Sequence, residues 1–236
     1  MNERIKAFGE KGSYTLADVR ELVEILRSDE GCAWDREQTH ESVRNALIEE
    51  TYEAVEGIDK KDAALLREEL GDVLFQIFFH ARLEEETGGF NIDDVADELC
   101  KKMVLRHPHV FGDVTVKDSG EVIRNWDAIK KVEKSRDTLG KQLESVPATL
   151  PSLMRAEKLL SRYKKNGGTV EKDPAALVLR LKEAVAALES EITPGTLGEL
   201  LFCTANLSYA VKINAEQALY DRNERFIAEK SGENEQ

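Results

Sequence analysis

Apolar side chains recur at helical spacing along most of the chain, and this periodicity limits the fold more than any other feature. It predicts helices over nine segments: 16–28, 41–57, 63–87, 92–106, 119–134, 152–165, 174–192, 196–211 and 214–230. The alternating pattern of a half-buried strand is nearly absent, and the strong helix formers Ala, Leu, Glu and Lys are abundant. The sequence therefore predicts an all-α protein.

Two prolines interrupt the helical pattern near the middle of the chain. Pro147 and Pro151 lie four residues apart, and each removes a backbone N–H donor and disfavours helix at the residue before it. The polar stretch at the C-terminus has few groups that could anchor it. We therefore expect a first helical domain over residues 1–138, a linker over 139–151, a second helical domain over 152–230 and a disordered tail over 231–236.

A short repeat relates the two halves. Leu70-Gly71-Asp72-Val73-Leu74-Phe75 recurs as Leu197-Gly198-Glu199-Leu200-Leu201-Phe202, in equivalent helical contexts. This predicts tandem helical-hairpin domains of the four-helix-bundle type. Thr196 stands where the first half has Glu69, and no two acids within 171–215 are three or four residues apart. We expect the second copy to be degenerate, with a structural or dimerising role.

The first copy carries two pairs of acids at matched spacing. Glu50 and Glu53 form one pair, and Glu69 and Asp72 form the other. Residues three apart share a helix face, and these acids lie within the apolar stripe. A short polar connection at 57–62 would let the pairs face each other across a hairpin.

Four facing carboxylates repel and need a compensating cation, and an all-oxygen cluster suits Mg²⁺, with Mn²⁺ as a second choice. The sequence thus predicts a metal site with Glu50, Glu53, Glu69 and Asp72 as ligands. The competing interpretation is a solvated acidic surface, because 46 acids among 236 residues place many pairs at this spacing by chance. Two pairs joined by one hairpin connection favour the metal site.

Composition narrows the classes of partner. The net charge of −13 argues against general binding of nucleic acid or of anionic membranes. No apolar run approaches the roughly 18 residues of a membrane-spanning helix, and the first residues do not resemble a signal peptide. The three cysteines lack metal-binding spacing and are odd in number, which favours reduced thiols. We expect a cytoplasmic location.

Several short sequence motifs, which follow one another along the first half of the chain, together resemble those of a known family. The chain reads GCAWDREQTHES over 31–42, LIEETYEA over 47–54, EELGD over 68–72 and RHPHVFG over 106–112. These runs resemble the MazG family of nucleoside triphosphate pyrophosphohydrolases, whose signature is EExxE…ExxD. The resemblance implies an all-α homodimer that requires Mg²⁺ and hydrolyses nucleoside triphosphates to monophosphates and pyrophosphate. This chain departs from the family at Ala33, where proline is common, and in the eroded second site.

Five further residues fit the same chemistry. Lys102 and Arg106 are one turn apart, so they could hold phosphate oxygens, as a similar pair does in the family; a salt-bridged surface is the alternative. Trp126 could stack on a base and Lys130 lies one turn later, although core packing is the simpler role for the indole. Glu49 is a candidate second ligand or general base.

The expected reaction is attack of water on a phosphorus of the triphosphate chain, with pyrophosphate leaving, in a housecleaning role and in the first half only. No sequence signature of a covalent nucleophile or a P-loop is present. A di-iron protein would need Glu-x-x-His on two helices, and only Glu37 with His40 fits. A non-enzymatic nucleotide sensor or scaffold remains the open alternative.

Overall fold

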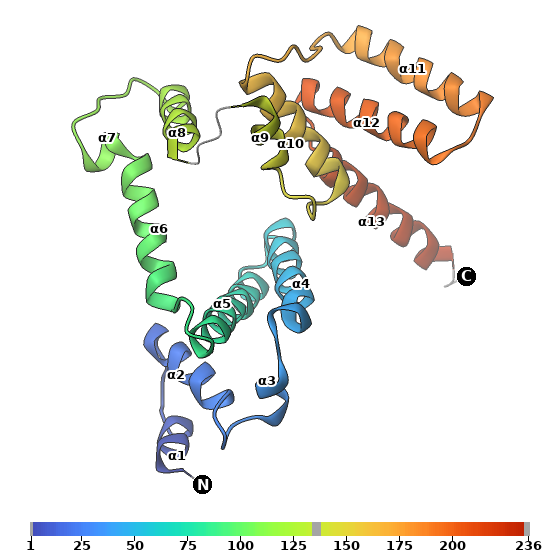
Figure 1. Cartoon of the computed structure of the whole chain (residues 1–236). Coiled ribbons are helices and arrows are strands. Elements are labelled where there is room, and N and C mark those ends of the chain that lie inside the picture. The colour runs from blue at the N-terminus through green and yellow to red at the C-terminus, as the bar shows by residue number, and fades with distance from the viewer. Residues whose placement is uncertain (1, 134–137, 234–236) are drawn as a thin grey trace. The chain divides into compact units, whose positions relative to one another are not determined.

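Helices account for every regular element of the protein in residues 2–133 and 138–233, which are the residues that the computed structural model describes (Figure 1). The prediction of an all-α fold is confirmed. The chain divides into two compact units, Met1–Val122 and Ile123–Gln236. Each unit is described by itself below.

The first unit contains the helices α1 (Glu3–Gly9), α2 (Leu16–Leu26), α3 (Ala33–Glu37), α4 (His40–Asp59), α5 (Ala63–Glu86), α6 (Ile92–Arg106) and α7 (Pro108–Phe111). Helix α8 (Ser119–Glu133) crosses the division between the units. The second unit contains α9 (Leu139–Glu144), α10 (Ser152–Lys165), α11 (Pro174–Ser190), α12 (Pro194–Val211) and α13 (Ala215–Glu233).

All nine predicted helices are present, with ends within three residues of the predicted ones where the structure describes them. The division between units falls before the predicted linker 139–151, and that segment contains α9. Residues 231–233 belong to α13, where we predicted a disordered tail, and residues 234–236 lie outside the described residues. The assignment of separate functional domains stays a prediction.

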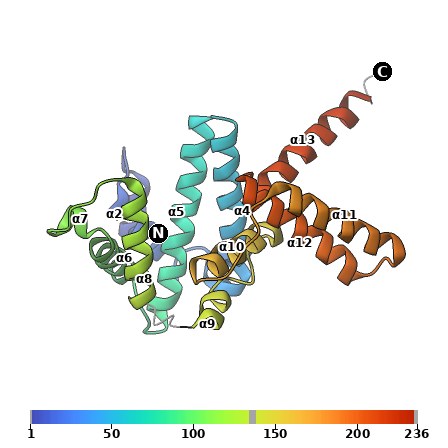
Figure 2. The ribbon, with the colours of Figure 1, turned by 90° about the horizontal axis from the view of Figure 1, so that it is seen from above.

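Helices α4 and α5 form an antiparallel hairpin and lie side by side in Figures 1 and 2. The side chain of Thr39 caps α4 by accepting a hydrogen bond from the backbone N–H of Ser42, 3.3 Å away. Asp62 caps α5 by accepting from the N–H groups of Ala64 and Leu65. Lys61, with φ of 55°, reverses the chain in the left-handed region. Local sequence thus sets the start of each helix, at the outer end of the hairpin for α4 and at the connection for α5.

The core of the first unit lies against the second half of α5. Val23 of α2 and Val43 of α4 pack there with Phe78, Phe79 and Leu83. Burial of such side chains contributes roughly 1.5–3 kcal/mol each. The hairpin is therefore held by its apolar end, while the turns that carry the acids lie nearer the connection.

A buried arginine ties α2 to the end of α5. The Arg27 side chain is only 7% exposed, donates to the Glu86 carboxylate at 2.7 Å, and lies 5.2 Å from the centre of the Phe79 ring. It also donates to the backbone carbonyl oxygens of Asp35 and Gln38. The segment that leads into α4 is thus anchored to the same end of α5.

The second unit repeats the hairpin in simpler form. Helices α11 and α12 are antiparallel neighbours, and α10 packs against α12 (Figure 1). Leu160, Leu177 and Ala205 are among its buried side chains.

The close approach of α4 and α5 can be tested at Gly57. A Cβ there would lie 2.8 Å from the backbone nitrogen of Leu66 and 2.9 Å from its Cα, so the two helices would have to separate. We expect Gly57→Ala to lower the free energy of unfolding by about 1–3 kcal/mol, the usual cost of overpacking. Circular dichroism during denaturant titration would measure the change.

Gly71→Ala is the matched control within the same hairpin. A Cβ at Gly71 meets nothing within 4 Å, and alanine is the better helix former by ~0.5–1 kcal/mol, so this variant should be slightly more stable. Equal destabilisation by both substitutions would contradict the proposed contact.

Candidate metal centre

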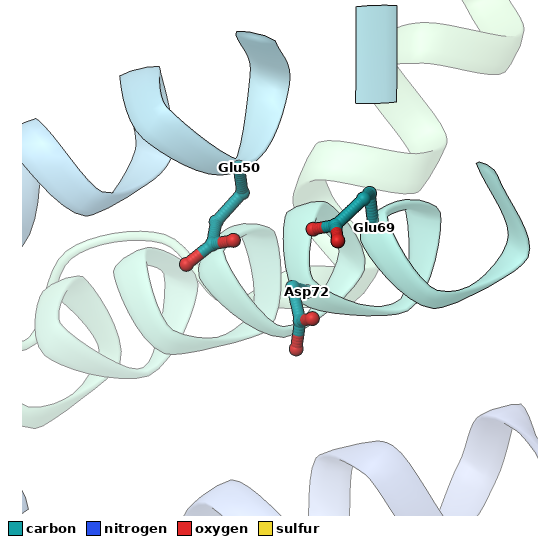
Figure 3. A group of neighbouring side chains, drawn as sticks. All are labelled: Glu50, Glu69 and Asp72. Atoms are coloured by element: carbon teal, nitrogen blue, oxygen red, sulfur yellow. The ribbon is translucent and has the colours of Figure 1, made fainter. Parts of the chain in front are cut away.

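Three carboxylates from the two helices of the first hairpin converge. Glu50 comes from α4, and Glu69 and Asp72 come from α5 (Figure 3). One oxygen from each of the three lies within 4.8 Å of the others. In the part of the chain that the structure describes, this is the one such group of acids, histidines or cysteines. The α4–α5 pairing therefore brings together three of the four predicted ligands, and we call them the acid cluster.

The three residues of the acid cluster differ in their exposure to solvent. Glu69 is buried, with 7% of its surface exposed, Glu50 is half-buried and Asp72 is exposed. A buried carboxylate is rare unless it is paired or bound to a metal. One side of the cluster thus faces the hairpin and the other faces solvent, as a site that receives a dissolved ligand requires.

The remaining two predicted acids lie at the edge of the cluster. Glu53 is exposed on α4, and its carboxyl group is close enough to that of Glu69 for a hydrogen bond when one of the two is protonated. Glu49 is exposed as well, and its charge acts on Glu50. Both residues are therefore positioned to influence the acid cluster, and their roles as ligand or base stay predictions.

The environment of the cluster disfavours negative charge. Burial raises the pKa of Glu69, and the charge of Glu53, its hydrogen bond and the charge of Asp72 raise that pKa further. Burial also raises the pKa of Glu50, followed by the charges of Asp72 and Glu53. Carboxyls that resist ionisation because they are buried and repel one another are the groups that a bound cation would stabilise.

The donor set fits a hard divalent cation. Mg²⁺ and Mn²⁺ take carboxylate oxygens and retain water or substrate phosphates in their other positions. Glu50, Glu69 and Asp72 would supply such oxygens from two rigid helices. The arrangement defines the class of site: a carboxylate cluster on a helical hairpin that could hold a metal ion.

The predicted phosphate-binding pair lies on a different helix from the acid cluster. Lys102 is half-buried and Arg106 is 5% exposed, both on α6. Helix α6 follows the end of α5 that is remote from Glu69, and Figure 1 shows it diverging from the α4–α5 hairpin. Their contact with phosphate stays a prediction.

Trp126 and Lys130 lie on the part of α8 that belongs to the second unit, and both are half-buried. Lys130 lines a cavity of about 190 Å³ together with Lys131, Arg162 and Lys165. The Asp127 carboxylate pairs with Lys165 at 2.6 Å. Sequence reasoning did not single out Lys131, Arg162 and Lys165, because sequence spacing does not show that residues of α8 and α10 line one cavity.

The comparisons agree with this geometry. A family model described as the MazG nucleotide pyrophosphohydrolase domain matches residues 38–111, which contain the whole acid cluster. The chain is 39% identical over 213 residues to the nucleoside triphosphate pyrophosphohydrolase/pyrophosphatase MazG of Thermotoga maritima, covering 87% of this chain and 80% of that one. It is 36% identical over 219 residues to the nucleoside triphosphate pyrophosphohydrolase of Escherichia coli K12, covering 87% and 81%.

This chain belongs to the MazG family. The family resemblance read from the sequence motifs is thereby confirmed. None of the helices in the described residues is long and apolar enough to cross a membrane.

The raised pKa of Glu69 predicts how stability depends on pH without metal. The folded protein holds the Glu69 proton more readily than the unfolded chain does, so folding becomes less favourable as the pH rises above the ordinary carboxyl value of 4.5. In EDTA, we expect the melting temperature of Glu69→Gln to exceed that of the wild type at pH 7, with a difference that shrinks towards pH 5.

Differential scanning fluorimetry from pH 5 to 8 would measure this difference. Glu98→Gln removes one charge from an exposed glutamate of α6 and should leave the pH profile as in the wild type. If the melting temperatures of Glu69→Gln and the wild type differ by the same amount at every pH, the charge on Glu69 does not destabilise the fold and the prediction is wrong.

Proposed function

We propose that this protein hydrolyses nucleoside triphosphates to nucleoside monophosphates and pyrophosphate, with Mg²⁺ as cofactor. The observation that carries the proposal is the convergence of Glu50, Glu69 and Asp72 from two helices, with oxygens within 4.8 Å. The names of the relatives from Thermotoga maritima and Escherichia coli supply the substrate class. We also propose a role in clearing unwanted nucleotides from the cell.

The acid cluster would hold the metal through Glu50, Glu69 and Asp72, with Glu53 available at its edge. When bound, the metal neutralises phosphate charge and lowers the pKa of water. Without this compensation, the carboxylates would repel the triphosphate, because both are anionic. The helices thus position negative groups so that the substrate can approach only together with its cation.

Water then adds to phosphorus at the α–β anhydride, the bridging P–O bond breaks, and pyrophosphate leaves with the electron pair. Glu49 is the candidate group that orients the water and accepts its proton, since it adjoins Glu50 and is exposed. Lys102 and Arg106 are proposed to contact phosphate oxygens, and Trp126 and Lys130 to contact the nucleotide. These assignments rest on the sequence pattern.

We propose that catalysis is confined to the first half. In the repeat register, Glu199 of α12 corresponds to Asp72 and Thr196 corresponds to Glu69. The Thr196 side chain is engaged with Thr193 in the cap of α12. In the second unit, the described residues form no acid group like the one on α4 and α5. The family match at residues 38–111 supports the same assignment.

The decisive assay is phosphorus NMR of purified protein with nucleoside triphosphates and Mg²⁺. We expect monophosphate and pyrophosphate as products, and no turnover in EDTA. Glu50→Gln combined with Glu53→Gln should lower kcat by about a hundredfold or more, because ligand changes cost at least as much as changes in the supporting residues.

Glu199→Gln is the control, since it makes the same chemical change at the equivalent position of the second copy, and its activity should equal that of the wild type. Release of orthophosphate would contradict the proposed bond cleavage. Absence of turnover by folded, metal-binding protein would favour a nucleotide sensor or scaffold.

We further propose a homodimer that uses the exposed apolar face of α4. Ile48, Tyr52 and Val55 follow helical spacing and are 41%, 53% and 42% exposed. Such a stripe is usually covered by a partner. A cytoplasmic location is proposed as well, supported by the exposed free thiol of Cys100.

The dimer can be tested with Val55→Glu, which places a charge in the middle of the stripe. Light scattering after gel filtration should give twice the chain mass for the wild type and a shift towards the monomer for the variant. Ile192→Glu, at a residue that is 84% exposed between α11 and α12, is the control and should remain dimeric. A monomeric wild type would disprove the proposal.

A further inference from the structure

The second unit contains a largely apolar cavity of about 350 Å³. Helices α10, α11 and α12 supply most of its wall, and α9 and the segment 169–171 supply the rest. We call it the α10–α12 cavity; its main lining residues are Leu159, Leu160, Tyr163, Arg180, Phe202 and Asn206. Its volume lies in the range of small-molecule sites, which begins at roughly 300 Å³.

A buried polar atom in the wall of this cavity lacks a partner. Asn206 is only 6% exposed, and among the described residues its Oδ1 has no hydrogen-bond donor. Leaving a buried amide oxygen unsatisfied costs about 1–3 kcal/mol. An N–H group of a ligand in the cavity would relieve this cost.

The position equivalent to Asn206 is apolar in the first copy of the repeat. The register that aligns Phe75 with Phe202 aligns Phe79 with Asn206, one helical turn later. Phe79 is 1% exposed and packs in the core of the first unit. The second copy thus has a smaller polar group where the first has a core aromatic ring, and its neighbour Ala205 replaces Phe78. Of these two residues, Asn206 lines the α10–α12 cavity.

The other lining groups suit an aromatic ring that carries a negative charge. Tyr163 and Phe202 are 38% and 39% exposed, and Gly168 lies against one side of the Tyr163 ring, so a base would stack on the other side of that ring and on Phe202. Arg180 is exposed and makes no ion pair with a carboxylate among the described residues. The Glu171 carboxylate, which also lines the cavity, accepts hydrogen bonds from the backbone N–H groups of Lys172 and Asp173. The charge of Arg180 also acts on Glu171, but the two groups form no salt bridge in the described residues, so the guanidinium can pair with a phosphate.

We propose that the α10–α12 cavity binds a nucleoside monophosphate, as a second ligand site distinct from the acid cluster. The base stacks on Tyr163 and Phe202, an N–H group of the base donates to Asn206 Oδ1, and the phosphate pairs with Arg180. Heterocyclic bases combine a π-face with N–H donors at their edge, which matches this set of groups. The assignment rests on the cavity alone and does not depend on the proposed hydrolysis.

The test is calorimetric titration of AMP into the full chain carrying Glu50→Gln and Glu53→Gln, in EDTA, so that metal-dependent binding at the acid cluster is removed. We expect one site per chain. Adenosine, which lacks the phosphate, and ribose 5-phosphate, which lacks the base, should each bind at least about tenfold more weakly.

Two variants and a control, made in the same background, separate this site from other sources of binding. Arg180→Ala should weaken AMP binding about tenfold or more, because a charged hydrogen bond is lost. Asn206→Leu should abolish binding while raising the melting temperature, because it fills the space and removes the unsatisfied oxygen. Lys182→Ala, at an exposed residue of the same helix as Arg180, should bind AMP as the parent does.

Absence of AMP binding, or binding that Asn206→Leu and Arg180→Ala leave unchanged, would overturn the proposal. A change of oligomeric state in Asn206→Leu without AMP binding by the parent protein would also overturn it, since another protein segment would then cover the cavity. The phosphorus NMR assay is read independently, so hydrolysis and this second site can fail separately.

Discussion

Repulsion among carboxylates on the α4–α5 hairpin is the interaction on which the rest of this structure depends. Glu69 and Asp72 are one turn apart on α5, and Glu50 is held near them because α4 and α5 are joined by a short connection and approach closely at Gly57. Burial is the main cause of the raised pKa values of Glu50 and Glu69, and the charges of the neighbouring acids raise those values further. A bound cation relieves the repulsion, and a triphosphate needs the same cation to approach. The same three acids therefore affect both the stability of the fold and the proposed chemistry.

Much of this arrangement could be predicted because it is local in sequence. Long amphipathic segments such as 92–106 and 152–165 were predicted with the ends that the structure shows, since capping residues and apolar periodicity act within a few residues. The acid cluster was predicted for the same reason: spacing of three residues fixes a helix face, and a short connection makes neighbouring helices antiparallel. The short helices α1, α3 and α7 are too brief for periodicity to reveal.

What could not be predicted depends on contacts between distant residues. Sequence spacing treats Glu53 and Glu69 as ligands of equal standing, whereas the hairpin buries Glu69 and leaves Glu53 exposed. The divergence of α6 from the hairpin is likewise a property of packing, so the place of Lys102 could not be predicted. Asn206 shows the converse case: the repeat aligns it with a core phenylalanine, but only the structure shows the cavity and the unsatisfied oxygen that result.

The most direct test of the account is Mn²⁺ binding followed by the paramagnetic resonance of the free ion, for the wild type, Glu69→Gln and Glu199→Gln. If the acid cluster is a metal centre, the wild type and Glu199→Gln will bind Mn²⁺ with equal affinity and Mg²⁺ will compete. Glu69→Gln will bind at least about tenfold more weakly. Equal affinity in all three proteins, or no binding by the folded wild type, would contradict the central claim.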